Sequence, residues 1–104
     1  MAKVKAVFFL PLRDNDGRGL DAEIGETEFE LYTTFVGFTC TGTVRGAYRM
    51  ADQSKAEDTC LAYFVVLDET RLDELKDVLR RFKAKTTQEA LYFEVQYNTV
   101  VDFI

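Results

Sequence analysis

The sequence predicts an α+β domain whose elements follow the order β-α-β-β-α-β. Three observations support this order: an apolar run at Val4–Leu12, a strict two-residue alternation over Val36–Met50, and an apolar run at Thr59–Leu67 that precedes a helical pattern and a last strand. The chain has 104 residues, 47% of them hydrophobic, so we expect a single domain, residues 1–104, with its own core.

The first half of the chain predicts a buried strand, a turn and a helix. Val4–Leu12 is apolar on both alternations, which is typical of a central strand. Arg13–Gly19 is rich in Asp, Asn and Gly and predicts a turn. Glu23–Phe35 predicts a helix, and Gly25 favours a start nearer Glu26 because glycine weakens a helical turn.

The segment Val36–Met50 predicts an edge strand with one polar face. Its apolar face contains Gly42 and Gly46, which indicate a β-bulge or a close approach by a helix. The opposite face carries a row of polar residues, namely Thr39, Thr41, Thr43, Arg45 and Arg49. This row could bind an anionic ligand or be ordinary edge-strand chemistry, and the polar segment Ala51–Asp58 follows as a loop.

The second half predicts a central strand, a helix and an outer strand. Thr59–Leu67 is apolar on both faces, and Thr70 with Asp73 resembles a capping box. An apolar stripe at helical spacing follows, made of Leu72, Leu75, Leu79 and Phe82. Ala90–Tyr97 predicts the fourth strand, and Thr99–Ile104 is an apolar tail.

Two buried strands between two outer strands predict a four-stranded antiparallel sheet of order 4-1-3-2. Right-handed crossovers then place both helices on one face, which gives a two-layer ferredoxin-like sandwich. The other face would carry apolar side chains that no helix covers, and such surfaces usually mark interfaces. We therefore expect a homodimer, with a monomer whose tail folds over its own sheet as the alternative. The expected interface residues are Phe9, Tyr63 (or Phe64 in its place), Tyr92, Phe103 and Ile104.

Composition argues against several classes of partner. The net charge of −5 and the pI of about 4.7 disfavour nucleic acid. No apolar run approaches the roughly 18 residues of a membrane span, so no membrane contact is expected and the location expected is cytoplasmic. Cys40 and Cys60 are expected as free, core-packing thiols. The absence of histidine removes the usual base and metal ligand, and no cofactor or metal is expected.

Polar residues in two loops are candidates for binding a ligand or partner. Asp14, Asn15 and Asp16 resemble the start of a calcium loop, but the fifth position is Arg18 and the twelfth is Gly25, which favours a turn. The same turn could border a ligand-binding mouth. Three residues that precede the later loop, Arg45, Tyr48 and Arg49, are matched by three acidic residues within it, Asp52, Glu57 and Asp58. They could form a salt-bridged base or a recognition tip, and both interpretations stay open.

Two functions follow from these candidates. The first is a non-enzymatic binding or regulatory module that acts on a protein or small ligand through the loops Asp14–Gly19 and Ala51–Asp58. The alternative is a small cofactor-free enzyme of the dimeric α+β barrel type. Glu94, a carboxylate in a mostly apolar strand, would then have a raised pKa and act with Tyr63 or Tyr92 in a cavity between sheet and helices. The catalytic residues of such an enzyme are unknown.

Three stretches together resemble an uncharacterised family of small bacterial ferredoxin-like proteins. They are Phe8–Pro11 running to Asp14–Gly17, then Gly37–Tyr48 with the polar loop to Asp58, then Thr87–Glu94. An aromatic residue often stands two positions after the second strand glycine of that family, where this chain has Tyr48. A glycine often precedes the Gln-Glu pair, where this chain has Thr87. The resemblance implies the fold and a bacterial origin and transfers no catalytic residue.

Overall fold

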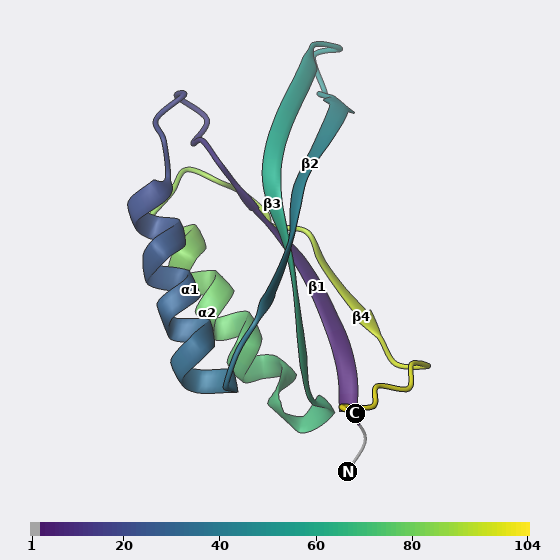
Figure 1. Ribbon diagram of the computed structural model, residues 1–104. Coiled ribbons are helices and arrows are strands. Elements are labelled where there is room, and N and C mark those ends of the chain that lie inside the picture. The colour runs from purple at the N-terminus through teal and green to yellow at the C-terminus, as the bar shows by residue number, and fades with distance from the viewer. Residues whose placement is uncertain (1–2) are drawn as a thin grey trace.

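The computed structural model describes residues 3–104 and has the predicted element order. Its elements are β1 (Lys3–Pro11), α1 (Asp21–Phe35), β2 (Thr39–Arg49), β3 (Lys55–Asp68), a 3-10 turn (Glu69–Arg71), α2 (Leu72–Ala84) and β4 (Phe93–Gln96). The strands form one antiparallel sheet in the order β2-β3-β1-β4, which is the predicted order read from the other edge. Both helices lie on one face of the sheet (Figure 1), so the predicted two-layer sandwich is confirmed.

The core lies between the helices and one face of β1 and β3. Alternate residues of each strand face the helices, since successive side chains of a strand point to opposite sides. The apolar stripe predicted for α2 is confirmed, with Leu75 and Leu79 buried. The buried apolar cluster contains Val4, Ala6, Phe8 and Leu10 of β1, Tyr63, Val65 and Leu67 of β3, Leu20, Ile24, Leu31 and Phe35 at and within α1, and Leu75, Val78, Leu79 and Phe82 of α2.

The helix starts differ from the sequence predictions. Helix α1 begins at Asp21 and includes Gly25 in its interior, so the later start expected from that glycine is wrong. Before α2, Asp68 is the capping residue, because its carboxylate accepts hydrogen bonds from the Thr70 amide at 3.1 Å and the Thr70 hydroxyl at 3.0 Å. Asp commonly accepts a hydrogen bond from a backbone amide two residues later. The capping box predicted on Thr70 is therefore replaced by an Asp-capped 3-10 turn.

A β-bulge in β2 changes which residues share a face. The pairing with β3 shifts between Cys40 and Gly42, and Gly42 has a φ of 115°. One extra residue in a strand moves every later side chain to the opposite face. The bulge expected from the glycines is confirmed, but the single row of threonines and arginines is wrong. Thr39 pairs with Phe64 on the open face, whereas Thr43 pairs with Leu61 on the helix face.

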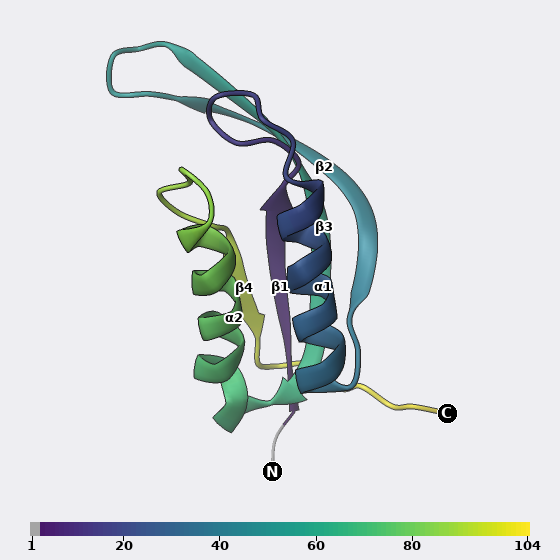
Figure 2. The same cartoon turned by 90° about the vertical axis from the view of Figure 1, so that its left-hand side faces the viewer.

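The β2–β3 hairpin extends well past the rest of the sheet. β3 begins at Lys55, four residues before the predicted start, and the connecting loop is correspondingly short. β1 pairs with β3 only as far as Pro11 and Cys60, while β2 and β3 continue to pair as far as Arg49 and Lys55. This two-stranded ribbon extends beyond both helices (Figures 1 and 2). It contributes to the elongated shape of the chain, which measures 45 × 27 × 23 Å along its principal axes.

The face of the sheet opposite the helices is partly apolar and has no helix over it. By register it carries Val7 and Phe9 of β1 and Phe64 and Val66 of β3. Tyr63 is not among them: it pairs with Phe8 on the helix face and is fully buried, so its predicted place on the open face is wrong. Phe64, which was the alternative to it, takes that position.

The C-terminal tail runs behind the sheet on its open side (Figure 2). Phe103 lies beside Phe64 and Val66, yet 81% of its surface is exposed, and Ile104 is fully exposed. The tail therefore crosses its own sheet and still leaves apolar surface in contact with solvent. Within residues 3–104, no helix has the length and apolar character needed to cross a membrane.

Candidate functional site

A hollow opens on the sheet's open face where the ribbon leaves the sheet. We call it the hairpin-base hollow; its volume is about 380 Å³. Its walls come from β1, from the β2–β3 hairpin and from the segment that leads into β4. The lining residues are Phe9, Pro11, Tyr48, Asp58, Cys60, Gln88, Ala90, Leu91 and Tyr92. Volumes of this order are typical of small-molecule sites.

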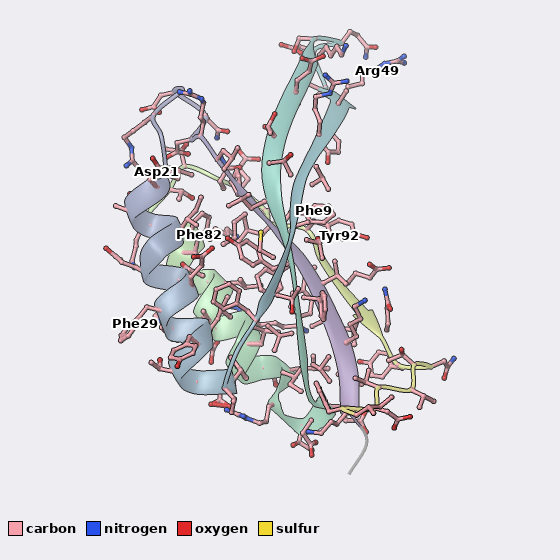
Figure 3. The ribbon with its side chains drawn as sticks, viewed as in Figure 1. Phe9, Asp21, Phe29, Arg49, Phe82 and Tyr92 are labelled. Atoms are coloured by element: carbon pink, nitrogen blue, oxygen red, sulfur yellow. The ribbon has the colours of Figure 1, made fainter. Side chains whose placement is uncertain are left out.

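Two stacked aromatic rings form one wall of the hollow. Phe9 and Tyr92 have ring centroids 4.5 Å apart and an interplanar angle of 11°, and they lie together where β1 passes the segment before β4 (Figure 3). The Phe9 amide donates to the Tyr92 carbonyl at 3.3 Å, which fixes the two backbones beside each other. Half of the Tyr92 surface remains exposed, so an aromatic surface is available in the hollow.

Tyr48 forms part of the opposite wall because Gly46 has no side chain. A Cβ atom at Gly46 would lie 2.7 Å from the Tyr48 hydroxyl and 3.0 Å from its ring carbons. The ring of Tyr48 therefore folds back along β2 over Gly46 and reaches the base of the ribbon. The close approach predicted for Gly46 exists, but the approaching group is Tyr48 and not a helix.

In the part of the chain that the structure describes, Asp58 is the only charged residue that lines the hollow. It lies in β3 opposite Gly46, beside Cys60 on the same face. Burial raises the pKa of the Cys60 thiol, and the Asp58 charge raises it further, so Cys60 stays protonated at neutral pH and adds apolar surface. Cys40 is exposed, so the expectation of core packing is wrong for it, and neither cysteine is in a disulfide. The hollow therefore favours a ligand with a positive charge and a flat apolar part.

A second cavity lies on the other side of the ribbon. This crevice, of about 570 Å³, separates the β1–α1 turn from the hairpin and is lined by Leu12, Arg13, Asp14, Asn15, Gly17, Ala56, Glu57, Asp58 and Thr59. Asp58 borders both cavities. The structure thus brings Asp14, Asn15, Tyr48 and Asp58, four of the predicted binding residues, to the base of the hairpin.

Asp14 is engaged in holding the structure together. Its buried carboxylate accepts hydrogen bonds from the Thr87 amide at 2.9 Å, the Thr87 hydroxyl at 2.5 Å and the Asn15 amide at 2.9 Å, and Arg18 lies 3.5 Å away. The pKa of Asp14 is lowered to about 2, mainly by the hydrogen bond that its carboxylate accepts from the Thr87 hydroxyl. This carboxylate joins the β1–α1 turn to the α2–β4 loop. Neighbouring Asp16 accepts from the Arg18 amide at 2.9 Å within the same turn.

The remaining predicted binding residues lie away from the hollow. Arg49 is at the far end of the ribbon (Figure 3), and Asp52 in the tip accepts hydrogen bonds from the Ser54 amide and hydroxyl. Arg45 pairs with Thr59 in the ladder. Among the ion pairs of residues 3–104, the ribbon contributes Lys55 with Glu57 and none with either arginine, so the predicted salt-bridged base is not formed. Gln88, Leu91 and Cys60 line the hollow without having been predicted to bind.

The predicted enzyme site between the sheet and the helices is not formed. Tyr63 is in the core, where its hydroxyl donates to Glu28 at 2.5 Å, and burial and this bond raise its pKa. Tyr92 lies on the opposite face of the sheet. Glu94 is an exposed residue of β4 that pairs with Val7 on that open face. These positions contradict a shared cavity between sheet and helices. In the described part of the chain, no group of three or more Cys, Asp or Glu is placed to hold a metal ion.

Comparison with known proteins identifies the fold. The structure is similar to the divalent ion tolerance protein CutA1 from Ehrlichia chaffeensis, with a TM-score of 0.64 and 9% identity over 97% of this chain and 85% of that one. It is also similar to a phage SAM lyase solved in complex with S-methyl-5′-thioadenosine, with a TM-score of 0.66 and 12% identity over 92% and 81% of the two chains. No family model and no curated protein matches the sequence. At these identities the likeness establishes a ferredoxin-like α+β sandwich.

Proposed function

We propose that this protein is a small-ligand-binding domain and that the hairpin-base hollow is its binding site. The observation that supports this most directly is the combination, in one cavity, of a stacked aromatic wall at Phe9 and Tyr92 with the carboxylate of Asp58, which forms no ion pair within residues 3–104. Among the described residues 3–104, no lysine or arginine lines the hollow. A compact ligand that carries a cation and a flat ring system matches these walls, since aromatic faces and carboxylates both attract cations.

S-Adenosylmethionine belongs to this chemical class. It combines a sulfonium cation with an adenine ring, and S-methyl-5′-thioadenosine is its uncharged thioether counterpart with the same ring. The phage SAM lyase with a similar fold was solved with the second compound bound. The chemistry of the hollow and this neighbour together make the two compounds the natural first probes, because they differ in the charge that Asp58 would recognise.

Isothermal titration calorimetry of the full chain with both compounds tests the proposal. We expect S-adenosylmethionine to bind about tenfold more tightly than S-methyl-5′-thioadenosine, because only the former has a cation for Asp58. Asp58→Asn should remove this difference. Asp52→Asn is the matched control, since that carboxylate lies at the tip of the same hairpin and accepts from Ser54. Absence of binding at millimolar ligand, or an unchanged charge preference in Asp58→Asn, would overturn the proposal.

The same samples separate binding from turnover. A binding domain leaves S-adenosylmethionine intact during the titration, and chromatography of the mixture measures this. Appearance of S-methyl-5′-thioadenosine in step with protein concentration, and its loss in Asp58→Asn, would instead assign a lyase activity to the hollow.

We propose in addition that the protein forms a homodimer through the open face of its sheet. This proposal is supported by the apolar residues Val7, Phe64 and Val66, which lie on a face without a helix, and by the exposed apolar tail beside them. Self-association would remove this surface from water, which is the usual outcome for apolar patches of this kind.

A further inference from the structure

Gln88 is a polar side chain of the hollow besides Asp58, and its orientation is determined by its neighbours. The residue lies in the loop between α2 and β4 and lines the hollow together with Tyr92. Its side-chain amide has one nitrogen, which donates, and one oxygen, which accepts. Which of the two faces the ligand therefore decides what the hollow recognises.

The hydrogen bonds behind Gln88 fix this orientation in two steps. Asn15 donates from Nδ2 to the Thr87 carbonyl at 2.9 Å, so the Oδ1 atom of Asn15 is the one that faces Gln88. Gln88 then donates from Nε2 to this oxygen at 3.3 Å and to Oδ1 of Asp14 at 3.4 Å. A rotated amide would place Oε1 of Gln88 against two acceptor oxygens, which is unfavourable.

The amide oxygen of Gln88 is left without a protein partner. Within residues 3–104, Oε1 accepts no hydrogen bond, although the residue is half-buried. The other polar side-chain groups that line the hollow are the Asp58 carboxylate, which only accepts, the Cys60 thiol, and the hydroxyls of Tyr48 and Tyr92, which can donate or accept. Next to the aromatic pair, the unpaired amide oxygen of Gln88 therefore offers an acceptor to a ligand that donates a hydrogen bond.

We infer that Oε1 of Gln88 accepts a hydrogen bond from the amino group of a purine stacked on the Phe9–Tyr92 wall, so that the hollow selects an aminopurine. This inference rests on the proposed function and names the group that determines its specificity. Sites built to hydrogen-bond a polar ligand group reject the analogue that lacks the group, because the site's own atom then stays unpaired. Asp14 and Asn15 act as positioning residues, since they hold Nε2 and leave Oε1 toward the ligand.

The test compares S-methyl-5′-thioadenosine with its analogue that has hydrogen in place of the 6-amino group, both titrated against the full chain. We expect the amino compound to bind about tenfold more tightly. In Gln88→Leu the amino compound should fall to the affinity of the analogue, while the analogue binds within threefold of its wild-type affinity. Asn15→Ala should lower the wild-type ratio, because it removes one of the two oxygens that orient the Gln88 amide, and it provides the same readout if Gln88→Leu does not fold.

Equal affinity of the wild type for the two compounds would overturn the inference and leave the proposed function standing. A preference for the amino compound that persists unchanged in both Gln88→Leu and Asn15→Ala would also overturn the inference, because another residue would then bind the amino group. Absence of binding by either compound and by S-adenosylmethionine would overturn the proposed function and this inference with it.

Discussion

Asp14 stands in a segment that the sequence predicted as a turn and, alternatively, as the border of a ligand-binding mouth; in the structure its carboxylate accepts hydrogen bonds from the protein itself. The difference arises from Thr87, whose amide and hydroxyl come from a loop 73 residues later in the chain. A long-range contact of this kind leaves no local pattern, so a turn rich in Asp and Asn reads as a binding loop. The residue nonetheless shapes the candidate site, because it holds Asn15 and Gln88 in place.

Replacing Asp14 by Asn should destabilise the protein at neutral pH, since an amide cannot accept all the hydrogen bonds that the carboxylate receives. The folded-state pKa of about 2 lies below the usual value of 3.8, so the stabilisation is full above the usual value. It is lost as the pH falls from 3.8 towards 2. Urea denaturation at pH 7, 4 and 2.5 should therefore show a difference between wild type and Asp14→Asn that shrinks at the lowest pH.

Asp102→Asn, in the exposed tail, is the control for this experiment and should match the wild type throughout. Equal stability of Asp14→Asn and wild type at pH 7 would contradict the structural role of Asp14. If the difference in stability between wild type and Asp14→Asn stayed constant down to pH 2.5, it would contradict the claim that the ionised form of Asp14 stabilises the protein.

At the scale of elements, the regular patterns predicted the fold well. The apolar runs of β1 and β3 predicted the strand order correctly, and the apolar stripe of α2 predicted the buried face of that helix. The errors have physical causes. A bulge at Gly42 reversed the faces of β2, and a single inserted residue does not disturb a periodic pattern enough to locate it. Tyr63 was placed on the wrong face because both faces of β3 are apolar, so alternation does not distinguish them.

The hairpin-base hollow could be predicted only in part. Tyr48 and Asp58 were candidates because they flank a polar loop, although the second half of that loop, from Lys55, belongs to β3. Gln88 and Cys60 were missed, since their position in the hollow depends on how the α2–β4 loop meets the hairpin. A contact between two loops in space follows from packing and not from periodicity. The resemblance motifs did include both the Gly46–Tyr48 spacing and the stretch that contains Gln88.

Gly25 and Gly42 offer a matched pair for testing the backbone assignments. A Cβ atom at either position meets no heavy atom within 4 Å, but Gly42 has a φ of 115° and Gly25 is helical. Gly25→Ala should stabilise the protein by about 0.5–1 kcal/mol, because alanine loses less conformational freedom in a helix. Gly42→Ala should destabilise it by about 1–3 kcal/mol through backbone strain at the bulge. Denaturant midpoints measure both, and a stabilising Gly42→Ala would contradict the bulge.

At the scale of the whole molecule, the single chain leaves part of the open face of its sheet uncovered. The tail passes over part of it and leaves Phe103 and Ile104 in solvent. Within residues 3–104, no third strand pairs with the ribbon beyond Pro11 and Cys60, and no helix packs on it. Because of these two features, the single chain exposes more apolar surface and more unpaired strand edge than a compact sandwich would. This exposure is the basis for proposing a homodimer.

Sedimentation velocity at tens of micromolar should show a dimer for the full chain. A chain shortened to end at Asn98 should remain dimeric, because the proposed contact is the sheet face, and Val66→Asp should give a monomer. Phe29→Asp is the control, since that side chain is 66% exposed on α1 and lies away from the face in question. Loss of the dimer on shortening would move the contact to the tail. A full chain that stays monomeric would contradict self-association.

The most direct test of the account is to map the ligand site by nuclear magnetic resonance. Amide signals of the ¹⁵N-labelled full chain are followed while S-adenosylmethionine is added. The account predicts that the largest shifts fall on residues 9, 46–48, 58–60 and 88–92, which surround the hairpin-base hollow, and that α1 and α2 shift little. Saturable shifts confined to any other surface, or no shifts at millimolar ligand, would contradict the assignment of this hollow as the binding site.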